Sequence, residues 1–416
     1  MGTSGDVLPA LAVAQEVASL GARVHVATHR RFLSAVRPPV TSSELPYDPL
    51  QVLETRAGRW LLNGGALGLK RALGAYGVLR SRIPDTFYAV HQIAQRADLL
   101  VYSGIPIGAQ YVIDAVAPAS VRLYLSPHWP TSENKSLHIS MPGDWGPRFN
   151  WYSHILVERA ARATFGSTFR RTLATLGIPE PEPAYLLDTS YWTEGVSIFA
   201  LPPQFANASI RERANARPVG FIRPDRSLPE PDDAVLSHLH DTPKPRVLMT
   251  FGSMVSPSVD LIDTRLCELA RRGEISLVRQ IGWKHLRHQE PDKNIITVPP
   301  SSHARLMAEC DVVVHHGGVG TVSACLEAQR PMLICPLWLD QFHLAALCEK
   351  LGVAIRIKPR ATDIQLLDAL TRASLDLRDV VRSVGPQLLA YDGRAAGGRM
   401  IVGMCNGGRF ERSSLV

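Results

Sequence analysis

The sequence has few cysteines, and they are unevenly placed. All six lie in the C-terminal half of the chain, at Cys267, Cys310, Cys325, Cys335, Cys348 and Cys405. None forms a CxxC pair, which excludes the common zinc ribbons. Isolated thiols of this kind fit buried free cysteines in a reducing cytoplasm.

The sequence also lacks long hydrophobic runs. No uninterrupted apolar stretch reaches about 18 residues, the length that would predict a membrane span. The first residues are Gly, Thr, Ser and Asp without a basic segment, which does not match a signal peptide. We therefore expect a cytoplasmic protein, with peripheral contact at the inner face of the membrane left open.

No long block of lysine and arginine is present. The chain has 45 basic and 38 acidic residues, a net charge of +7 that is mild for 416 residues. This balance suits a small anionic ligand or an anionic membrane surface, and we expect no nucleic-acid partner. The Arg-rich region 56–82 is the candidate for membrane contact, with a solvated amphipathic helix as the alternative. Nothing indicates an oligomeric state.

What the sequence does contain is an alternation of strand-like and helix-like segments in both halves. Hydrophobic residues make up 45% of the chain, and this length accommodates two domains. The alternation predicts an α/β protein with parallel sheets. Residues 40–90 and 127–190 alternate poorly and suggest variable loops and helices around a substrate cleft. We predict five segments: an N-terminal Rossmann-like domain (1–222), a proline-rich and acidic linker (223–245), a C-terminal Rossmann-like domain (246–385), a C-terminal helix that could pack back on the first domain (386–405) and a tail (406–416).

Residues 312–341 carry the strongest motif. A buried strand ends in two histidines, followed by the turn His316-Gly317-Gly318-Val319-Gly320-Thr321 and a helix-compatible stretch. A second apolar strand then leads to Asp340-Gln341. A strand, a glycine turn and a helix start together form a phosphate cradle, because backbone N–H groups approach the ligand and the helix N-terminus favours negative charge.

A second glycine turn opens the C-terminal domain. Gly252-Ser253 follows a predicted strand, a position suited to another phosphate contact, although any α/β domain can carry such a turn. A similar turn lies at Gly2–Gly5 in the first half. A ligand cleft would face the carboxyl ends of both sheets.

These motifs, together with the segment GTSGDVLPALAVAQEVASLGARVHVAT, resemble family 1 glycosyltransferases of GT-B fold, particularly bacterial members acting on small apolar acceptors. The resemblance covers nearly the whole chain and extends loosely to rhamnolipid-type rhamnosyltransferases and sterol glucosyltransferases. It implies a UDP- or dTDP-linked hexose donor bound mainly by the C-terminal domain, an apolar lipid, polyketide or sterol-like acceptor bound mainly by the N-terminal domain, and inversion without a metal or cofactor. The absence of a DxD motif agrees with this.

The resemblance also implies roles for single residues. His316, Gly318, Gly320 and Thr321 would bind the donor diphosphate, with Gly252 and Ser253 adding phosphate contacts. Asp340 and Gln341 would bind sugar hydroxyls, although Asp340 could instead cap a helix. Ala324 occupies the position where plant-type members have a ribose-binding glutamate, which leaves the choice between UDP and dTDP open.

The acceptor hydroxyl must lose a proton, so a general base is expected. Asp6 occupies the position of the family's base, and its alternative role is to cap the first helix. His128, after a predicted strand, is the other candidate base.

Relatives have an apolar strand before the GTxGD turn, whereas this sequence starts at that turn. We therefore expect the first, central strand of the N-terminal sheet to be missing, through a misplaced start or through decay of the gene. Two other functions stay open: a catalytically silent glycosyltransferase-like partner protein and a GT-B sugar-nucleotide 2-epimerase.

Overall fold

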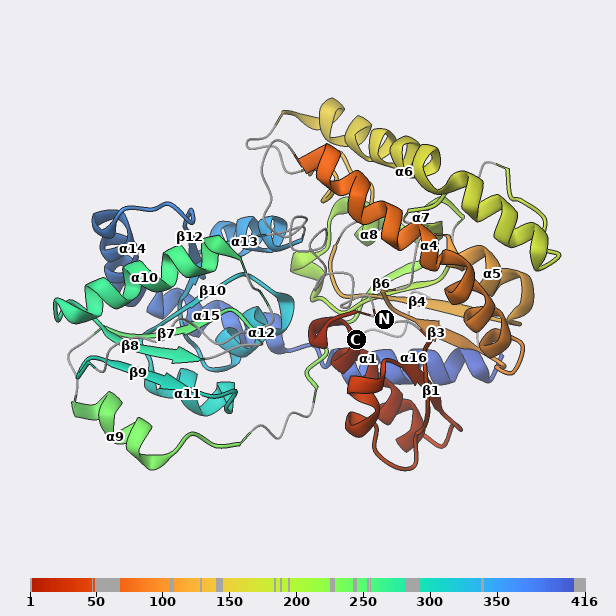
Figure 1. Cartoon of the computed structure of the whole chain (residues 1–416). Helices are drawn as coiled ribbons and strands as arrows, with labels where there is room; N and C mark the ends of the chain where they lie inside the picture. The colour runs from red at the N-terminus through yellow and green to blue at the C-terminus, as the bar shows by residue number, and fades with distance from the viewer. Residues whose placement is uncertain are drawn as a thin grey trace. The chain divides into compact units, whose positions relative to one another are not determined.

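The computed structural model describes most of the chain. It covers residues 2–46, 48, 68–104, 108–127, 129–139, 145–182, 185–187, 189–193, 195–224, 229–241, 245–252, 254, 256–280, 292–337 and 340–407. At residues 68–79, 189, 190, 234, 238, 240 and 241 it describes the backbone alone. The chain divides into two compact units, residues 1–224 with 391–416 (unit 1) and residues 225–390 (unit 2) (Figure 1).

Unit 1 alternates helices and strands. Its strands are β1 (His25–Thr28), β2 (Thr41–Glu44), β3 (Leu100–Tyr102), β4 (Ser120–Tyr124), β5 (Ser197–Phe199) and β6 (Ala216–Pro218). Its α-helices are α1 (Ser4–Ser19), α4 (Gly68–Ala94), α5 (Ala109–Val116), α6 (Pro147–Thr175), α7 (Thr189–Trp192), α8 (Ala208–Glu212) and α16 (Gly393–Cys405), and its 3-10 helices are η1 (Arg30–Ala35) and η2 (Pro203–Phe205).

The described strands of unit 1 form two parallel sheets, β1-β2 and β3-β4-β5-β6, which share no hydrogen-bonded strand pair. Apolar residues of β4 and β5 join those of α1 and α16 in one core cluster, which includes Val13, Leu123, Ile198 and Ile401.

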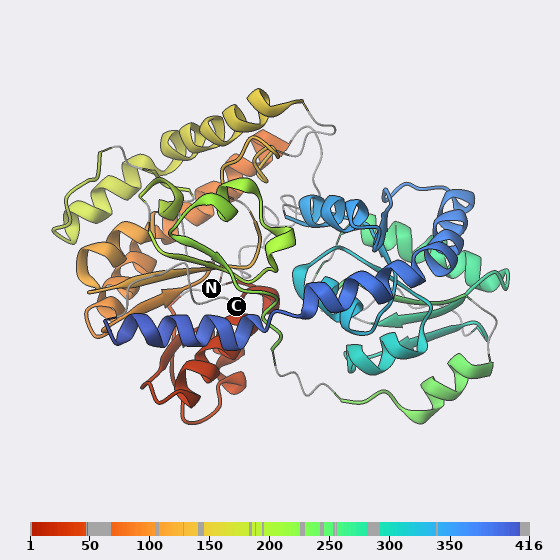
Figure 2. The same cartoon turned by 180° about the vertical axis from the view of Figure 1, so that it is seen from behind.

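The last helix of the chain belongs to unit 1. Helix α16 lies against α1 (Figure 2). A Cβ atom at Gly398 would lie 2.5 Å from Cγ of Glu16, so the close approach of the two helices requires a glycine there. Arg394 pairs with Glu16 at 3.1 Å. The predicted helix over residues 386–405 is in fact interrupted, since α15 ends in unit 2 at Leu389 and α16 begins at Gly393.

Two segments that we expected to be irregular contain the longest helices. Helix α4 has 27 residues and α6 has 29, and the two pack side by side. The sequence pattern did not identify α6 as one long helix, because its inward face carries buried polar residues, among them Asn150, Ser153 and Glu158. The expected apolar stripe is therefore broken on the side that faces the core.

Unit 2 is a doubly wound α/β structure. Its strands are β7 (Arg246–Thr250), β8 (Ser276–Gln280), β9 (Ile295–Val298), β10 (Val312–His315), β11 (Met332–Ile334) and β12 (Ala354–Arg356). Its helices are α9 (Asp233–Asp241), α10 (Pro257–Arg271), α11 (His303–Glu309), α12 (Val319–Glu327), α13 (Gln341–Lys350), α14 (Asp363–Asp376) and α15 (Arg378–Leu389). Helix α9 thus lies inside the segment 223–245 that the sequence suggested as a linker.

The six strands of unit 2 pair in the order β12-β11-β10-β7-β8-β9, all parallel. Val312, Val313 and Val314 are all fully buried, although successive residues point to opposite faces of the sheet. Both faces are therefore covered, which explains the continuous apolar runs that identified these strands in the sequence. The strand order reverses direction between β7 and β10.

Candidate functional site

The strand ends at this reversal form the candidate site. Thr250, the last residue of β7, is the register partner of His315, the last residue of β10. Open α/β sheets bind ligands outside the carboxyl ends of their strands at such a point. The loops that follow the two strands contain Gly252 and His316, both proposed from the sequence as diphosphate ligands.

The glycine turn after β10 has strict steric requirements. Gly317 has a φ of 91°, and a Cβ atom there would lie 2.8 Å from Cγ2 of Ile334. A Cβ atom at Gly318 would lie 2.6 Å from Nε2 of His316. Both positions therefore require glycine, and they let the backbone pass directly beside the histidine ring.

Helix α12 starts immediately after this turn. Its N-cap residue is Gly318, which has no side chain to accept hydrogen bonds from the first-turn N–H groups. Gly320 is exposed, and a Cβ atom there would meet nothing within 4 Å. Thr321 is half-buried in the same turn. The start of α12 thus offers backbone donors next to open space, as an anion site needs.

His315 holds the turn rather than facing a ligand. The backbone N–H of Gly317 donates a hydrogen bond of 3.0 Å to its Nδ1 atom. The side chain is fully buried, and burial, followed by the proximity of His316 and His303, lowers its pKa well below the ordinary value. The ring is therefore neutral, with its proton on Nε2.

His316 follows the strand and lies beside the second loop. Burial, followed by the proximity of His303, lowers its pKa to about 4. A Cβ atom at Gly252 would lie 3.9 Å from Cε1 of His316, so the loops of β7 and β10 meet at this ring. Among the described residues, none hydrogen-bonds to the buried Nδ1 of His316.

A polar network that the sequence did not reveal lies on the β8 side of the site. Oγ1 of Thr250 donates to Oε1 of Gln280 at 2.9 Å, and Nε2 of His303 lies 2.8 Å from the same oxygen. Nε2 of Gln280 donates to the carbonyl oxygen of Ser301 at 2.9 Å. These are single polar residues at the ends of apolar segments, and only the strand order β10-β7-β8 brings them together.

Asp340 and Gln341 lie at the start of α13. Asp340 occupies the N-cap position of α13, and its side chain makes no capping hydrogen bond there. Oε1 of Gln341 accepts a hydrogen bond of 2.9 Å from the N–H of Leu337, and its Nε2 lies 3.7 Å from Sδ of Met254. Gln341 therefore orders two loops around the site, a role that the sequence did not suggest.

The start of α13 also adjoins the glycine turn. A Cβ atom at Gly317 would lie 3.4 Å from the carbonyl oxygen of Gln341. The structure thus gathers His316, Gly318, Gly252 and Gln341 within one part of unit 2.

Asp6 lies in unit 1, in the first turn of α1. Its Oδ2 atom accepts a hydrogen bond of 2.7 Å from the N–H of Thr3 and one of 3.0 Å from the Thr3 hydroxyl. A Cβ atom at Gly2 would lie 2.3 Å from the same oxygen. The carboxylate thus forms half of a capping box, the alternative role considered from the sequence.

Several predicted residues are not described. His128 and Ser253 lie outside the described residues, as do residues 56–67 of the Arg-rich region. Within the described part of that region, Nε of Arg80 donates to Oγ1 of Thr168 at 2.7 Å, and Arg82 pairs with Asp85 at 3.7 Å. Both side chains therefore have protein partners.

Two features are absent from the described part of the chain, a metal site and a membrane-spanning helix. No group of three histidine, cysteine or carboxylate side chains there could hold a metal ion. Every helix there is too short or too polar to cross a bilayer.

Comparison with known proteins adds to this geometry. No protein-family model matches the chain. A sterol 3-beta-glucosyltransferase of Candida albicans is 24% identical over 405 residues, which cover 93% of this chain and 26% of that protein. Its counterpart in Aspergillus terreus is 24% identical over 412 residues, or 95% and 29% of the two chains. The chain thus spans less than a third of the length of these two curated relatives.

Solved structures align along almost the entire chain. The glycotransferase of kitacinnamycin superposes with a TM-score of 0.67 at 16% identity, covering 96% of both chains. Glycosyltransferase VinC in complex with dTDP gives a TM-score of 0.63 at 18% identity, covering 97% of both chains. The chain therefore has the GT-B fold of these glycosyltransferases.

Proposed function

We propose that the protein is an inverting, metal-independent glycosyltransferase. It transfers a hexose from a UDP- or dTDP-linked sugar to a hydroxyl of a small apolar acceptor of lipid, polyketide or sterol-like type. The observation that carries this proposal is the neutral, half-buried His316 beside the glycine-capped start of α12. The glycosyltransferase fold and the VinC complex with dTDP support it.

The leaving group explains why these residues suit the reaction. As the glycosidic bond breaks, negative charge develops on the nucleotide diphosphate. Donors that are already fixed in place stabilise this charge more in the transition state than in the ground state. The N–H groups at the start of α12, the hydroxyl of Thr321 and the ring of His316 would supply such donors.

The protonation state of His316 follows from the same geometry. A ring with a pKa of about 4 is neutral at pH 7, so it donates one hydrogen bond without a full charge. A bound diphosphate would raise this pKa, because a nearby negative charge favours the protonated ring. Donor binding should therefore be accompanied by partial proton uptake.

The other proposed ligands divide into two groups. Asp340 binds sugar hydroxyls, whereas Gln341 acts mainly by holding the loops that contain Leu337 and Met254. On the acceptor side we keep Asp6 as the general base, with His128 as the alternative.

Donor binding measured calorimetrically tests the proposal. We expect UDP- or dTDP-sugars to bind the wild-type protein and His316→Ala to weaken that binding by at least tenfold. His343→Gln is the matched control, because His343 is also buried, has its pKa lowered to about 4 by burial, and lies in α13 of the same unit.

Unchanged binding in His316→Ala would refute the diphosphate assignment. Binding without transfer to any acceptor would favour the silent partner protein. Release of an epimerised sugar nucleotide would favour the 2-epimerase.

A further inference from the structure

The outer face of helix α6 exposes large apolar side chains. Trp145 is 56% exposed, Tyr152 is 64% exposed and Leu156 is 60% exposed. Phe149 lies between them and packs against Trp145 with ring centroids 5.4 Å apart. Residues 149, 152 and 156 follow one another at intervals of three and four, which places them on one side of the helix, and Trp145 lies two residues before its start.

This outward orientation is fixed by the inward face of the same helix. Glu158 is buried, and its two oxygens accept hydrogen bonds of 2.6 and 2.8 Å from the N–H groups of Leu186 and Leu187. Oγ of Ser153 accepts a hydrogen bond of 2.7 Å from the N–H of Ser136. Rotating α6 to bury its aromatic residues would break these bonds, so their exposure is a stable property of the fold.

The exposed charge of helix α6 is positive. Glu158 is its only carboxylate and is buried, whereas its five arginines are exposed. These are Arg148, Arg159, Arg162, Arg170 and Arg171. The first three form no ion pair with any described residue. The face therefore presents aromatic and aliphatic side chains among guanidinium groups, and of the five only Arg170 pairs with a described carboxylate, that of Glu180 at 3.9 Å.

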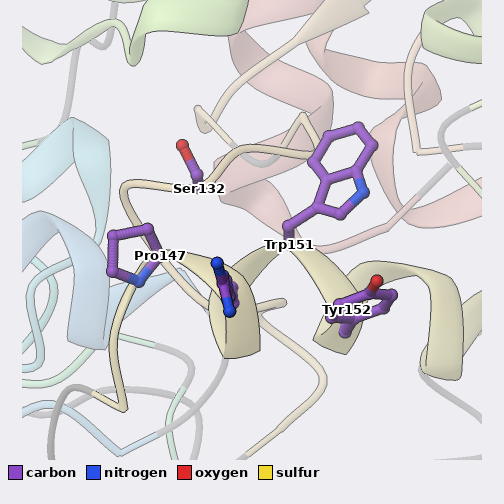
Figure 3. A pocket seen from close by; sticks show the side chains of 5 residues that line it. Ser132, Pro147, Trp151 and Tyr152 are labelled. Atoms are coloured by element: carbon purple, nitrogen blue, oxygen red, sulfur yellow. The ribbon is translucent and has the colours of Figure 1, made fainter.

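An open hollow lies at the N-terminal end of this face. Its volume is about 480 Å³, and it is lined by Ser132, Pro147, Arg148, Trp151 and Tyr152. Figure 3 shows Trp151 and Tyr152 projecting from neighbouring positions of α6, with Ser132 on the facing segment. The hollow combines apolar walls with a hydroxyl, a phenol and a guanidinium, groups that suit the head group of a phospholipid.

We propose that the outer face of α6, from Trp145 to Arg171, docks onto an anionic lipid bilayer. Tryptophan and tyrosine settle at the level of lipid head groups, where one end of the ring is apolar and the other is wet. Arginines bind phosphates, and each basic residue near an anionic surface strengthens binding about fivefold. This surface differs from the Arg-rich region 56–82 that the sequence suggested, and it does not depend on the proposed reaction.

Vesicle co-sedimentation of the full chain at 0.1 M salt, a condition under which surface charges are only partly screened, tests the proposal. We expect binding to vesicles of phosphatidylcholine with phosphatidylglycerol and little binding to phosphatidylcholine alone. The variant Arg148→Gln/Arg159→Gln/Arg162→Gln should bind about 100-fold more weakly, from three fivefold losses. The variant Tyr152→Ser/Leu156→Ser should lose about tenfold or more.

Two controls match these variants. Arg23→Gln/Arg30→Gln/Arg37→Gln removes the same charge from exposed positions elsewhere in unit 1. Ile364→Ser/Leu375→Ser removes side chains that are 82% and 72% exposed on α14 of unit 2. Both controls should bind vesicles like the wild type. All variants replace exposed residues, and unchanged circular dichroism and melting temperature would verify their folding.

Three outcomes would overturn the proposal. One is no binding of the wild type to anionic vesicles. Another is equal loss in the α6 variants and their controls, which would reflect net charge alone. The third is a wild-type dimer in sedimentation velocity that the α6 variants dissolve, which would assign this face to a second copy of the chain.

Discussion

The N–H of Gly317 donates to Nδ1 of His315 across 3.0 Å, so the backbone of the turn sets the tautomer of a buried histidine. The same turn needs glycine at two consecutive positions, 317 and 318. A Cβ atom at Gly317 would clash with Ile334, and one at Gly318 would clash with the ring of His316. The two adjacent histidines thus have different tasks. His315 shapes the turn, and His316 is left to meet a ligand.

Acid should destabilise unit 2 through its neutral histidines. Burial lowers the pKa of His316 and of His343 from 6.5 to about 4, so folding favours the neutral ring in both. Their contribution to the free energy of unfolding is complete above pH 6.5. It is lost as the pH falls from 6.5 towards 4, by up to about 3 kcal/mol per histidine. In urea unfolding at several pH values, His343→Gln should reduce this loss. His25→Gln, at an exposed position, should leave it unchanged, and an unaltered pH profile in His343→Gln would contradict the assignment.

Substitution of Gly317 should be much more harmful than substitution of Gly320. Gly317→Ala forces a side chain into a φ of 91° and against Ile334, which we expect to cost about 2–4 kcal/mol of unfolding free energy. Gly320→Ala places its methyl group in open space within a helix and should stabilise the protein by up to about 1 kcal/mol. Urea unfolding of the two variants measures the difference, and equal effects would show that the turn relaxes.

Breaking the buried pair Asp263–Arg279 should lower the free energy of unfolding strongly, whereas replacing both residues with apolar ones should have a small effect. Two contacts of 2.6 Å join the carboxylate to the guanidinium, and the side chains are 4% and 2% exposed. Asp263→Ala should cost about 3–5 kcal/mol because it leaves a buried charge without compensation, whereas Asp263→Leu/Arg279→Met should recover most of that loss.

The exposed pair Arg372–Asp368 provides the comparison for this experiment. Asp368→Ala should change stability by less than about 1 kcal/mol. A small effect of Asp263→Ala, similar to that of Asp368→Ala, would mean that water reaches Arg279.

Two variants distinguish the proposed role of Asp6 as a general base from its role as a helix cap. Asp6→Asn keeps an oxygen that accepts hydrogen bonds from Thr3 but cannot take a proton, so transfer should fall by about 10²–10⁴-fold with little change in stability. Thr3→Ala removes the hydroxyl bond and keeps the carboxylate, so it should lose about 1 kcal/mol of stability and retain most of the transfer rate. Initial rates with one donor and one acceptor decide this, and full activity of Asp6→Asn would leave His128 as the candidate base.

The sequence predicted unit 2 better than unit 1 for a physical reason. Strands such as β7 and β10 are buried on both faces, so they appear as continuous apolar runs bounded by turns. The first half of helix α6 departs from this pattern, since its inward side carries Glu158 and its outward side carries Tyr152. The periodicity of apolar residues therefore does not identify this half of the helix or its exposed face.

The candidate site shows the same limit. His316 and the glycines around it were predicted because they are adjacent in the sequence and form a motif with a chemical purpose. Gln280 and His303 were missed because they are far from that motif and meet Thr250 only through the order of the strands. The task of Gln341 was missed because the bonds that it makes to Leu337 and Met254 depend on loops that no pattern encodes.

Helix α16 makes unit 1 discontinuous along the chain, with the whole of unit 2 inserted between its two parts. During synthesis, the helix that covers α1 is made after every element of unit 2. Until it arrives, part of the apolar core of unit 1 has no cover, whereas all elements of unit 2 are already present. A purified chain that ends at residue 390 should therefore hold a protease-resistant unit 2 and a protease-sensitive unit 1.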